Sequence, residues 1–378
     1  MVKILINGAT ILTLSMVHDP VIERGYVYVK DGKIMEVGKG EPPEDLKYPE
    51  LLINGAGRIV MPGLSTAFTT VTLYPFRYRV TDVDWEYVKE FLTTLTRTDV
   101  YYLAAMAFME MMMRGITSAL VTDIYLDNVA RAAHDAGMYV TLAPPMNAGL
   151  EDFNPENEVR LLTSRWHGKV SEVRAALLTY GEPSEEFIDL LSKYRLRGYI
   201  LKSEEIKEGL GDVAYINPKG SVPNTCSVIR YGDGLSHWSE GEGLGIGVRP
   251  AYSMVDVVRD TSLRTGVSEI DVLHAAVATN NKLIGHSLGP IEVGATANIV
   301  MLDTSSPPGW PPPRRIDDIV RAVAYGDLRV ETVIVGDNIL VDAGETLTMG
   351  SEVVMKARSR FDDKVVEYLS KNDFISSG

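Results

Sequence analysis

Six histidines and one cysteine are the side chains in this chain that bind transition metals best, so their spacing decides whether a catalytic metal fits. A catalytic zinc needs about three protein ligands and keeps one position for a water molecule, whose pKa it lowers. Only His237, just before a strand expected at 244–247, is predicted to reach the ends of the central strands. The others are His18, His134, His167, His274 and His286. A single loop histidine does not make a metal site, so the spacing predicts no metal and no other cofactor.

Polar side chains that follow the expected central strands form a second candidate site. The set comprises Thr70, Asp123, Glu182, Lys202, Glu204, Asn217 and Arg249. Glu182 or Glu204 could exchange protons with Lys202, and a lysine or arginine could hold a carboxylate or phosphate of a small-molecule ligand. The alternative, which we favour, is a network of internal ion pairs that fills the space, because buried acids need cations for neutrality.

The centre of the chain alternates between strands and helices. A strand is expected near Val60, and later strands are expected at 117–123, 138–143, 174–180, 198–201, 213–216, 226–229 and 244–247. Helical segments separate several of them, and Ser184 followed by two acids begins one. Such alternation implies parallel strands, and eight of them predict an α/β fold, a (β/α)₈ TIM-like barrel with trimmed units.

Both ends of the chain contain short strands and turns. Asp31–Gly32 and Gly336–Asp337 each separate two apolar runs, which is a strong hairpin signal. We expect residues 1–60 and 292–349 to build one small β-sandwich domain. The barrel, residues 61–291, is then inserted into it, and residues 350–378 form a C-terminal helix that packs back.

The composition of the chain argues against some classes of binding partner. The chain has 378 residues, 37 basic and 51 acidic, so its formal charge is −14. This acidic balance argues against binding nucleic acid or anionic membranes, and no apolar stretch is long enough to span a bilayer. Cys226 is the single cysteine, which favours a reducing cytoplasm. The absence of glutamine is typical of a thermophile.

Several segments together resemble the metal-dependent amidohydrolase superfamily. They are Asp31–Ile34, Arg58–Leu64, Glu110–Thr117, Asn217–Pro218 and Gly289–Val300. The nearest branch is that of the triazine hydrolases and the guanine, cytosine and adenosylhomocysteine deaminases. The resemblance spans nearly the whole chain and implies a barrel that hydrolyses C–N bonds, in a homodimer or a larger homo-oligomer.

The metal ligands of that superfamily have no counterpart in this sequence. The resemblance places a His-x-His pair at Phe68 and Thr70, and an aspartate at Gly247. Phenylalanine cannot bind a metal and fills the space with apolar volume. The remaining histidines fall at Thr179 and Arg197 in one alignment, which puts Glu182 at the superfamily's catalytic glutamate. In the alignment that we favour, Glu204 takes that place.

Three interpretations of the function remain. The one that we favour is a metal-free divergent member with a small-molecule-binding or structural role. In the second, the chain is an enzyme with acid–base chemistry from Glu182 or Glu204 and Lys202. In the third, it hydrolyses C–N bonds of cyclic amides, amidines or aminopurines with a relocated metal.

Overall fold

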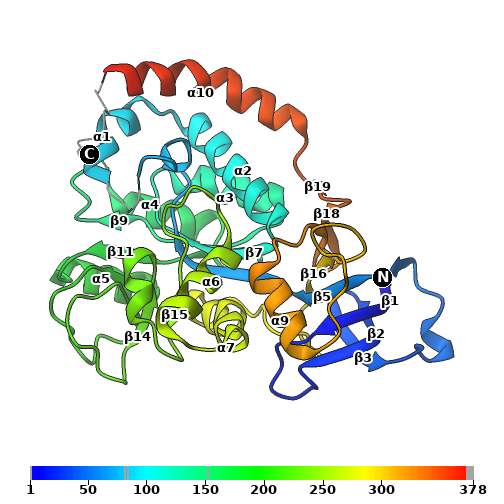
Figure 1. Ribbon diagram of the computed structural model, residues 1–378. Helices are drawn as coiled ribbons and strands as arrows, with labels where there is room; N and C mark the ends of the chain where they lie inside the picture. Colours follow the sequence, from blue (N-terminus) through cyan, green and yellow to red (C-terminus); the bar gives the residue numbers. More distant parts are fainter. Residues whose placement is uncertain (1, 81, 83–84, 151–152, 372–378) are drawn as a thin grey trace.

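The two ends of the chain lie side by side in one mixed sheet of nine strands (Figure 1). The computed structural model describes residues 2–80, 82, 85–150 and 153–371. The order of the sheet is β19-β18-β17-β16-β5-β1-β2-β3, with β4 paired to β1. These strands are β1 (Lys3–Leu12), β2 (Val21–Lys30), β3 (Lys33–Lys39), β4 (Leu51–Asn54), β5 (Arg58–Pro62), β16 (Asn298–Asp303), β17 (Val330–Val335), β18 (Asn338–Asp342) and β19 (Glu345–Thr346).

The expected hairpins are present in this sheet, but the expected sandwich is not confirmed. The strand β2 pairs with β3 and β17 pairs with β18, both antiparallel. Asp31, Gly32 and Gly336 have positive φ in their turns, as tight hairpins require. The two ends meet through the antiparallel pair of β5 and β16. They therefore join edge to edge in one sheet, whereas the prediction had two sheets packed face to face.

One face of the mixed sheet has an apolar core of its own. Ile4 and Ile6, two positions apart on β1, point to the same face, because side chains alternate along a strand. They pack in one cluster with Val29 of β2 and Ile299 of β16, and none of the four is more than 1% exposed. This core links strands from both ends of the chain and fixes where the central segment begins and ends.

The centre of the chain supplies parallel strands in two sheets. The first has the order β10-β8-β7-β6 and the second the order β15-β14-β13-β12-β11-β9. Their bounds are β6 (Leu64–Thr69), β7 (Ile116–Val121), β8 (Tyr139–Leu142), β9 (Pro145–Met146), β10 (Val173–Ala175), β11 (Leu177–Tyr180), β12 (Gly198–Leu201), β13 (Val213–Ile216), β14 (Ser227–Arg230) and β15 (Gly243–Leu244). The α/β class with parallel strands is confirmed. The strand near Val60 instead belongs to the mixed sheet, as β5.

These strands do not form the single closed sheet that the sequence predicts. The breaks lie between β8 and β9, at Pro144, and between β10 and β11, at Ala176. Proline has no N–H group to donate to a neighbouring strand, which accounts for the first break. Both halves keep one register, because Val140 pairs with Val173 and Met146 with Thr179, each 33 positions apart (173 − 140 and 179 − 146). At the other junction a single bridge joins Thr69 to Gly247.

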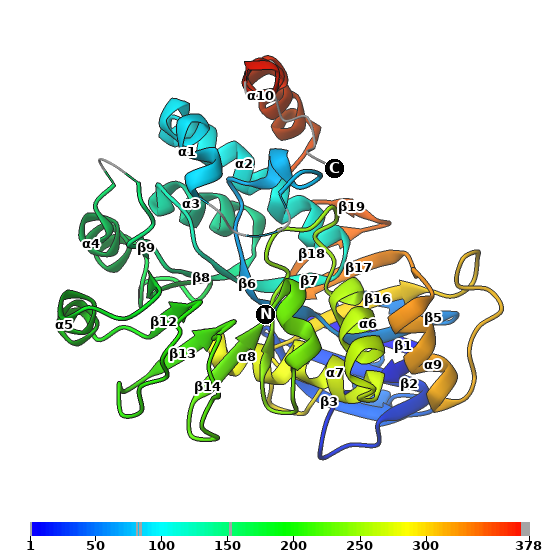
Figure 2. The same ribbon diagram turned by 60° about the vertical axis from the view of Figure 1, so that its left-hand side comes forward.

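Helices flank the parallel strands (Figure 2). They are α1 (Trp85–Thr94), α2 (Arg97–Met113), α3 (Leu126–Ala136), α4 (Pro155–Arg165), α5 (Glu185–Tyr194), α6 (Met254–Thr265), α7 (Glu269–His274) and α8 (Asn280–Ile284), with α9 (Ile316–Tyr325) and α10 (Ser351–Lys371) in the C-terminal part. Residues 202–226, all of them described, contain no helix, so the units around β13 are trimmed. No helix in the described part of the chain combines the length and apolar character needed to cross a bilayer.

The C-terminal helix α10 packs along α2 (Figure 1). The Asp99 carboxylate near the start of α2 is 1% exposed and receives Arg360 at 2.9 Å and Lys364 at 3.2 Å. Phe361 between them is buried. The same carboxylate closes a capping box with Thr96, which separates α1 from α2. An apolar contact and two ion pairs therefore fix α10 to the central segment.

Candidate functional site

Asp123, directly after β7, is fully buried beside the turn that follows β6. Its Oδ2 accepts hydrogen bonds from Thr70 Oγ1 (2.8 Å), Val71 N (2.8 Å) and Thr72 N (2.9 Å). Its Oδ1 accepts hydrogen bonds from Thr72 Oγ1 (2.6 Å) and Ile124 N (2.9 Å). Burial raises the pKa of Asp123, and hydrogen bonds from Thr72, Val71 and Ile124 oppose that rise. The protein itself therefore occupies both oxygens of this carboxylate.

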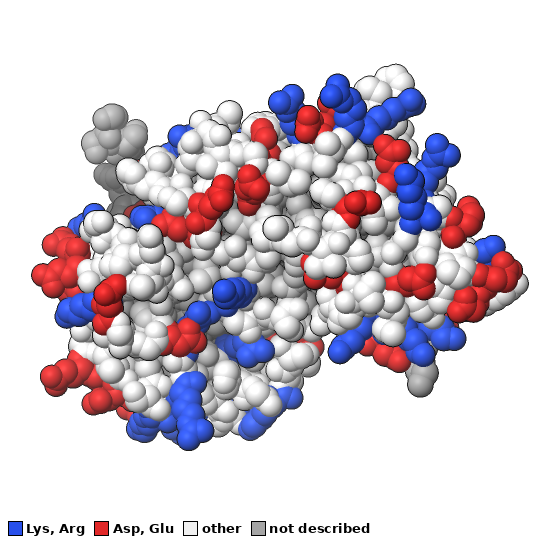
Figure 3. Space-filling model, turned by 90° about the horizontal axis from the view of Figure 1, so that it is seen from below, with Lys and Arg blue, Asp and Glu red and all other residues white. Residues whose placement is uncertain are grey.

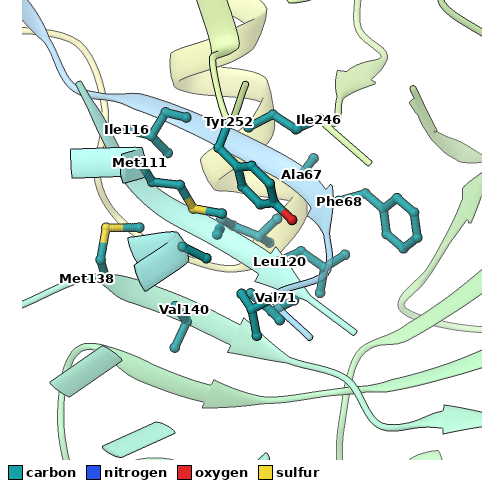
Figure 4. Close-up of a cluster of buried hydrophobic side chains, with 14 of the residues drawn as sticks. Ala67, Phe68, Val71, Met111, Ile116, Leu120, Met138, Val140, Ile246 and Tyr252 are labelled. Atoms are coloured by element: carbon teal, nitrogen blue, oxygen red, sulfur yellow. The ribbon is translucent and has the colours of Figure 1, made fainter. Parts of the chain in front are cut away.

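Phe68 and Tyr231 fill the space between the ends of β6, β14 and β15. Phe68 is fully buried, and its ring lies 4.8 Å from that of Tyr231, centroid to centroid. In Figure 4 the Phe68 side chain points away from the cluster of Met111, Met138 and Val140. Gly247 has φ +63°, and a Cβ atom there would lie 2.5 Å from Tyr231 Cδ2. A side chain at position 247 would therefore collide with the tyrosine ring.

A metal of the kind that the superfamily uses does not fit these residues. In the described ranges, no group of three or more His, Cys, Asp or Glu side chains lies close enough together to hold a metal ion. Asp123 is saturated by hydrogen bonds, and Gly247 has no room for a carboxylate. The position-by-position substitution of the superfamily's ligands stays a prediction from the resemblance.

A carboxylate that bridges two proton donors lies at the ends of β12 and β14. Asp82 Oδ1 accepts a hydrogen bond of 2.6 Å from the Tyr231 hydroxyl. Asp82 Oδ2 accepts one from the ammonium group of Lys202, with which it forms an ion pair. Lys202 follows β12 and has a φ of 58°, a left-handed conformation that is uncommon outside glycine. The fold thus brings a base and two donors together from three separate segments.

The three members of this group differ in burial. The side chains of Asp82 and Lys202 are 45% and 36% exposed, whereas Tyr231 is 2% exposed. Burial first, and the Asp82 carboxylate second, raise the pKa of Tyr231 well above its ordinary value. The Tyr231 hydroxyl therefore stays protonated and donates, while a molecule from solvent can reach Asp82 and Lys202. An arrangement of this kind can move protons to and from a bound molecule.

Asn217 holds the backbone of Tyr231. Its Nδ2 donates to the Tyr231 carbonyl (2.9 Å), and its Oδ1 accepts from the Tyr231 N–H (3.1 Å). This bidentate contact fixes the start of the loop after β14 and with it the tyrosine ring. Asn217 itself has a φ of 45°, a conformation that asparagine tolerates better than most residues. Of the predicted site residues, Asn217 is thus a positioning residue for this group.

Glu182 and Glu204, predicted as acids or bases, have structural partners. Glu182 Oε1 accepts hydrogen bonds from Ser203 Oγ (2.8 Å), Glu204 N (3.0 Å) and Glu205 N (3.1 Å). Burial acts to raise the pKa of Glu182, but hydrogen bonds from Glu205, Ser203 and Glu204 outweigh it and lower that pKa. Glu204 is exposed and forms an ion pair with Lys219 at 3.0 Å. Glu182 therefore closes the turn after β12.

Arg249, a predicted site residue, lies outside the group, and two members of the group were not predicted. Arg249 forms an ion pair with Asp260 of α6 at 2.9 Å, apart from Lys202. Asp82 and Tyr231 were not among the predicted site residues. Tyr231 directly follows β14, so the rule that chemistry gathers at strand ends could have found it. Asp82 carries no such signal, because it lies in a loop after the helical turn η2 (Tyr74–Phe76).

Two cavities lie outside this group. One, of about 640 Å³, runs along α2 and is lined by Met106, Met109 and Met113. The methionine run, predicted to be core packing, therefore also lines a groove, although Met111 and Met112 are fully buried. The other, of about 490 Å³, lies between α1, the end of β7 and the start of α4.

No protein-family model matches this chain. Individual proteins of known sequence do match it, along nearly its whole length. The 5′-deoxyadenosine deaminase of Methanosarcina acetivorans is 24% identical over 443 residues, covering 97% of this chain and 99% of the relative. The 5-methylthioadenosine/S-adenosylhomocysteine deaminase of Halothermothrix orenii is 24% identical over 425 residues, covering 93% and 97%.

Solved structures similar to this one have the same fold. An adenosine deaminase from Xanthomonas campestris with bound zinc has a TM-score of 0.79 at 16% identity, covering 96% of this chain and 98% of that one. A zinc complex of atrazine chlorohydrolase from Arthrobacter aurescens has a TM-score of 0.75 at 16% identity, covering 94% and 99%. The fold of this chain is thus shared with these two structures. The sequence relatives support the resemblance to the amidohydrolase superfamily.

These relatives correct the interpretation that we favoured from the sequence. A metal-free divergent member with a binding or structural role was predicted, because the expected ligand positions hold other residues. Proteins that match the chain along nearly its whole length are instead named as deaminases. The interpretation as a hydrolase of C–N bonds agrees with them better.

Proposed function

We propose that this protein is a hydrolase of non-peptide C–N bonds that deaminates an amino-substituted heteroaromatic ring such as an aminopurine. The observation that carries the proposal is the Asp82 carboxylate between Lys202 and Tyr231 at the ends of β12 and β14. In parallel α/β enzymes, active sites form at the carboxyl ends of the strands. The names of the sequence relatives support the reaction class, and the small-molecule partner is this substrate.

The side chains of this group supply each proton transfer of the reaction. Asp82 takes a proton from water as the water oxygen bonds to the ring carbon, and the adjacent ring nitrogen takes up the displaced electron pair. As Asp82 becomes protonated, the single hydroxyl hydrogen of Tyr231 leaves Asp82 and donates a hydrogen bond to that nitrogen. The Lys202 ammonium then gives a proton to the amino group, the C–N bond breaks and ammonia leaves as the ring C=N bond re-forms. The product tautomerises to the carbonyl form, and the proton on Asp82 returns to Lys202.

The proposal rests on the electrostatics of the group as well as on its geometry. An ammonium and a phenol both donate to the Asp82 carboxylate, which places a base between two donors. The buried Tyr231 ring gives the site an apolar wall, and Asn217 fixes its orientation. General acid–base catalysis of this kind contributes about 10²–10⁴ to a rate.

The test is ammonia release from 5′-deoxyadenosine and from S-adenosylhomocysteine by protein purified without chelators. We expect turnover by the wild type, a loss of at least about a hundredfold for Lys202→Ala, and no change for Glu204→Gln, whose ion pair is exposed. Dialysis against a chelator should leave the rate unchanged. Absence of ammonia release by the wild type, or full activity of Lys202→Ala, would refute the proposal.

A further inference from the structure

The cavity beside β7 combines aromatic, cationic and acidic side chains. Its volume is about 490 Å³, within the range of small-molecule sites. Its walls include Arg97, Tyr125, Leu150, Phe153, Asn157 and Glu158. None of Asp82, Lys202 and Tyr231 lines it, so it is separate from the group at the ends of β12 and β14. Figure 2 shows α1 and α4, which both contribute to its lining, on one side of the molecule.

Glu158 is a buried carboxylate with one oxygen available to the cavity. Its side chain lines the cavity although the residue is only 7% exposed. Oε2 accepts a hydrogen bond of 2.7 Å from Leu126 N at the start of α3. Within the described part of the chain, Oε1 accepts none. An N–H group of a bound molecule can therefore donate a hydrogen bond to Oε1.

Tyr125 forms a wall of the cavity in a strained backbone conformation. It precedes α3 with φ 49° and ψ 46°, and its side chain does not cap the helix. A left-handed conformation outside glycine costs about 1 kcal/mol or more, and such strain gathers at ligand sites. Phe153 and Leu150 face the same cavity and are partly buried. These side chains provide the apolar surface that a flat ring needs.

Arg97 supplies a positive charge at the edge of this surface. It is the first residue of α2, and its guanidinium lies 5.8 Å from the centre of the Tyr125 ring. Among the described residues it has no ion-pair partner within salt-bridge distance. Its donors are therefore available to an anionic group, which a guanidinium can bind in a bidentate manner.

We propose that this cavity is a second binding site, for a small molecule with a flat heteroaromatic ring, an N–H donor on that ring and an anionic substituent. The ring lies against Tyr125 and Phe153, the N–H donates to Glu158 Oε1, and the anion pairs with Arg97. The proposal goes beyond the proposed deamination and does not depend on it.

The test is isothermal titration of the full chain with adenosine 5′-monophosphate, which carries all three features. Two matched compounds each lack one feature: purine riboside 5′-monophosphate has no amino group, and ribose 5-phosphate has no ring. We expect saturable binding of adenosine 5′-monophosphate and at least about tenfold weaker binding of both matched compounds. The variants Arg97→Ala and Glu158→Gln should each weaken binding about tenfold or more.

The variant Lys202→Ala separates this site from the proposed active site. It should bind adenosine 5′-monophosphate as the wild type does, while Arg97→Ala should keep the ammonia release of the wild type. Because Arg97 is exposed, its substitution tests the site even if Glu158→Gln fails to fold. Absence of saturable binding by the wild type would overturn the proposal. So would unchanged binding in Arg97→Ala, or loss of binding in Lys202→Ala alone.

Discussion

The carboxylates Asp123 and Asp82 lie near the ends of parallel strands in two regions of the same segment, yet their surroundings differ. Asp123 is buried and accepts five hydrogen bonds, three of them from backbone N–H groups. Asp82 is about half exposed and lies between an ammonium and a phenol. The first carboxylate has no remaining capacity for a ligand. The second can accept a proton, and Lys202 beside it can supply one.

This difference gives Asp123 a structural role and makes Asp82 the candidate for proton transfer. Backbone N–H groups cannot lose a proton, so the bonds to Asp123 can only hold the turn after β6 in place. One partner of Asp82 is the Lys202 ammonium, which can give up a proton, and both Asp82 and Lys202 are open to solvent. The region around β6 and β7 thus serves as a support, and the region around β12 and β14 as the candidate reaction site.

The largest effect is expected from Asp123→Ala. It would leave the N–H groups of Val71, Thr72 and Ile124 buried without an acceptor, each at a cost of about 1–3 kcal/mol. We expect the free energy of unfolding to fall by about 4 kcal/mol or more, measured by urea denaturation. Asp82→Ala removes a partly exposed ion pair and one acceptor, that of the buried Tyr231 hydroxyl, so it should cost less, about 1–3 kcal/mol. Equal losses in both variants would remove the distinction between the two carboxylates.

The next effect is on catalysis and should be seen at Asp82 and at its partner Tyr231. Asp82→Asn keeps the shape but cannot take a proton, so kcat/KM for ammonia release should fall by about a hundredfold or more. Tyr231→Phe removes one hydrogen bond to the substrate and should lower kcat by about tenfold to a hundredfold. Steady-state assays with 5′-deoxyadenosine measure both. Wild-type rates in Asp82→Asn would show that this carboxylate is not the base.

The sequence predicts the strands of the fold better than it predicts the candidate reaction site. Alternating apolar runs and helix signals were enough to find the parallel strands, because strand and helix periods are local. Asp31–Gly32 was enough to find a hairpin. The closure of the strands was not predictable in the same way. Pro144 has no N–H group, and whether this breaks the sheet depends on which strand lies beside it in the fold.

The candidate site depends on contacts between residues far apart in the chain. Asp82 meets Lys202 across 120 positions and Tyr231 across 149. No pattern near Asp82 indicates these partners. Lys202 and Asn217 were found because they directly follow strands, and the roles of Glu182 and Glu204 were not predictable because their hydrogen bonds come from a turn after β12. The domain boundaries, the cytoplasmic location and the homo-oligomer stay predictions.

A smaller effect is expected where the protein positions the site. Asn217→Ala removes both hydrogen bonds to the Tyr231 backbone, at about 1–2 kcal/mol of unfolding free energy. If Asn217 orients Tyr231, kcat should fall by about tenfold while KM changes little. Asn217→Asp, which keeps the acceptor for Tyr231 N, should recover part of that loss. A stability loss without any change in kcat would leave Asn217 with a purely structural role.

The smallest effect concerns Glu182, whose pKa is lowered in the folded protein. A carboxyl group with a lowered pKa stabilises the fold above its unfolded pKa of 4.5, and this contribution is lost as the pH falls through the folded value. Glu182→Gln should therefore lower the free energy of unfolding at pH 7 by no more than about 1 kcal/mol, because the carboxylate is exposed. The difference from the wild type should vanish in urea denaturation well below pH 4. The deficit of Asp123→Ala should persist there, since a protonated Asp123 still accepts hydrogen bonds from the turn. If the loss of unfolding free energy in Glu182→Gln does not change with pH, the charge of Glu182 contributes nothing to stability. The difference between Glu182 and Asp123 would then come from their hydrogen bonds alone.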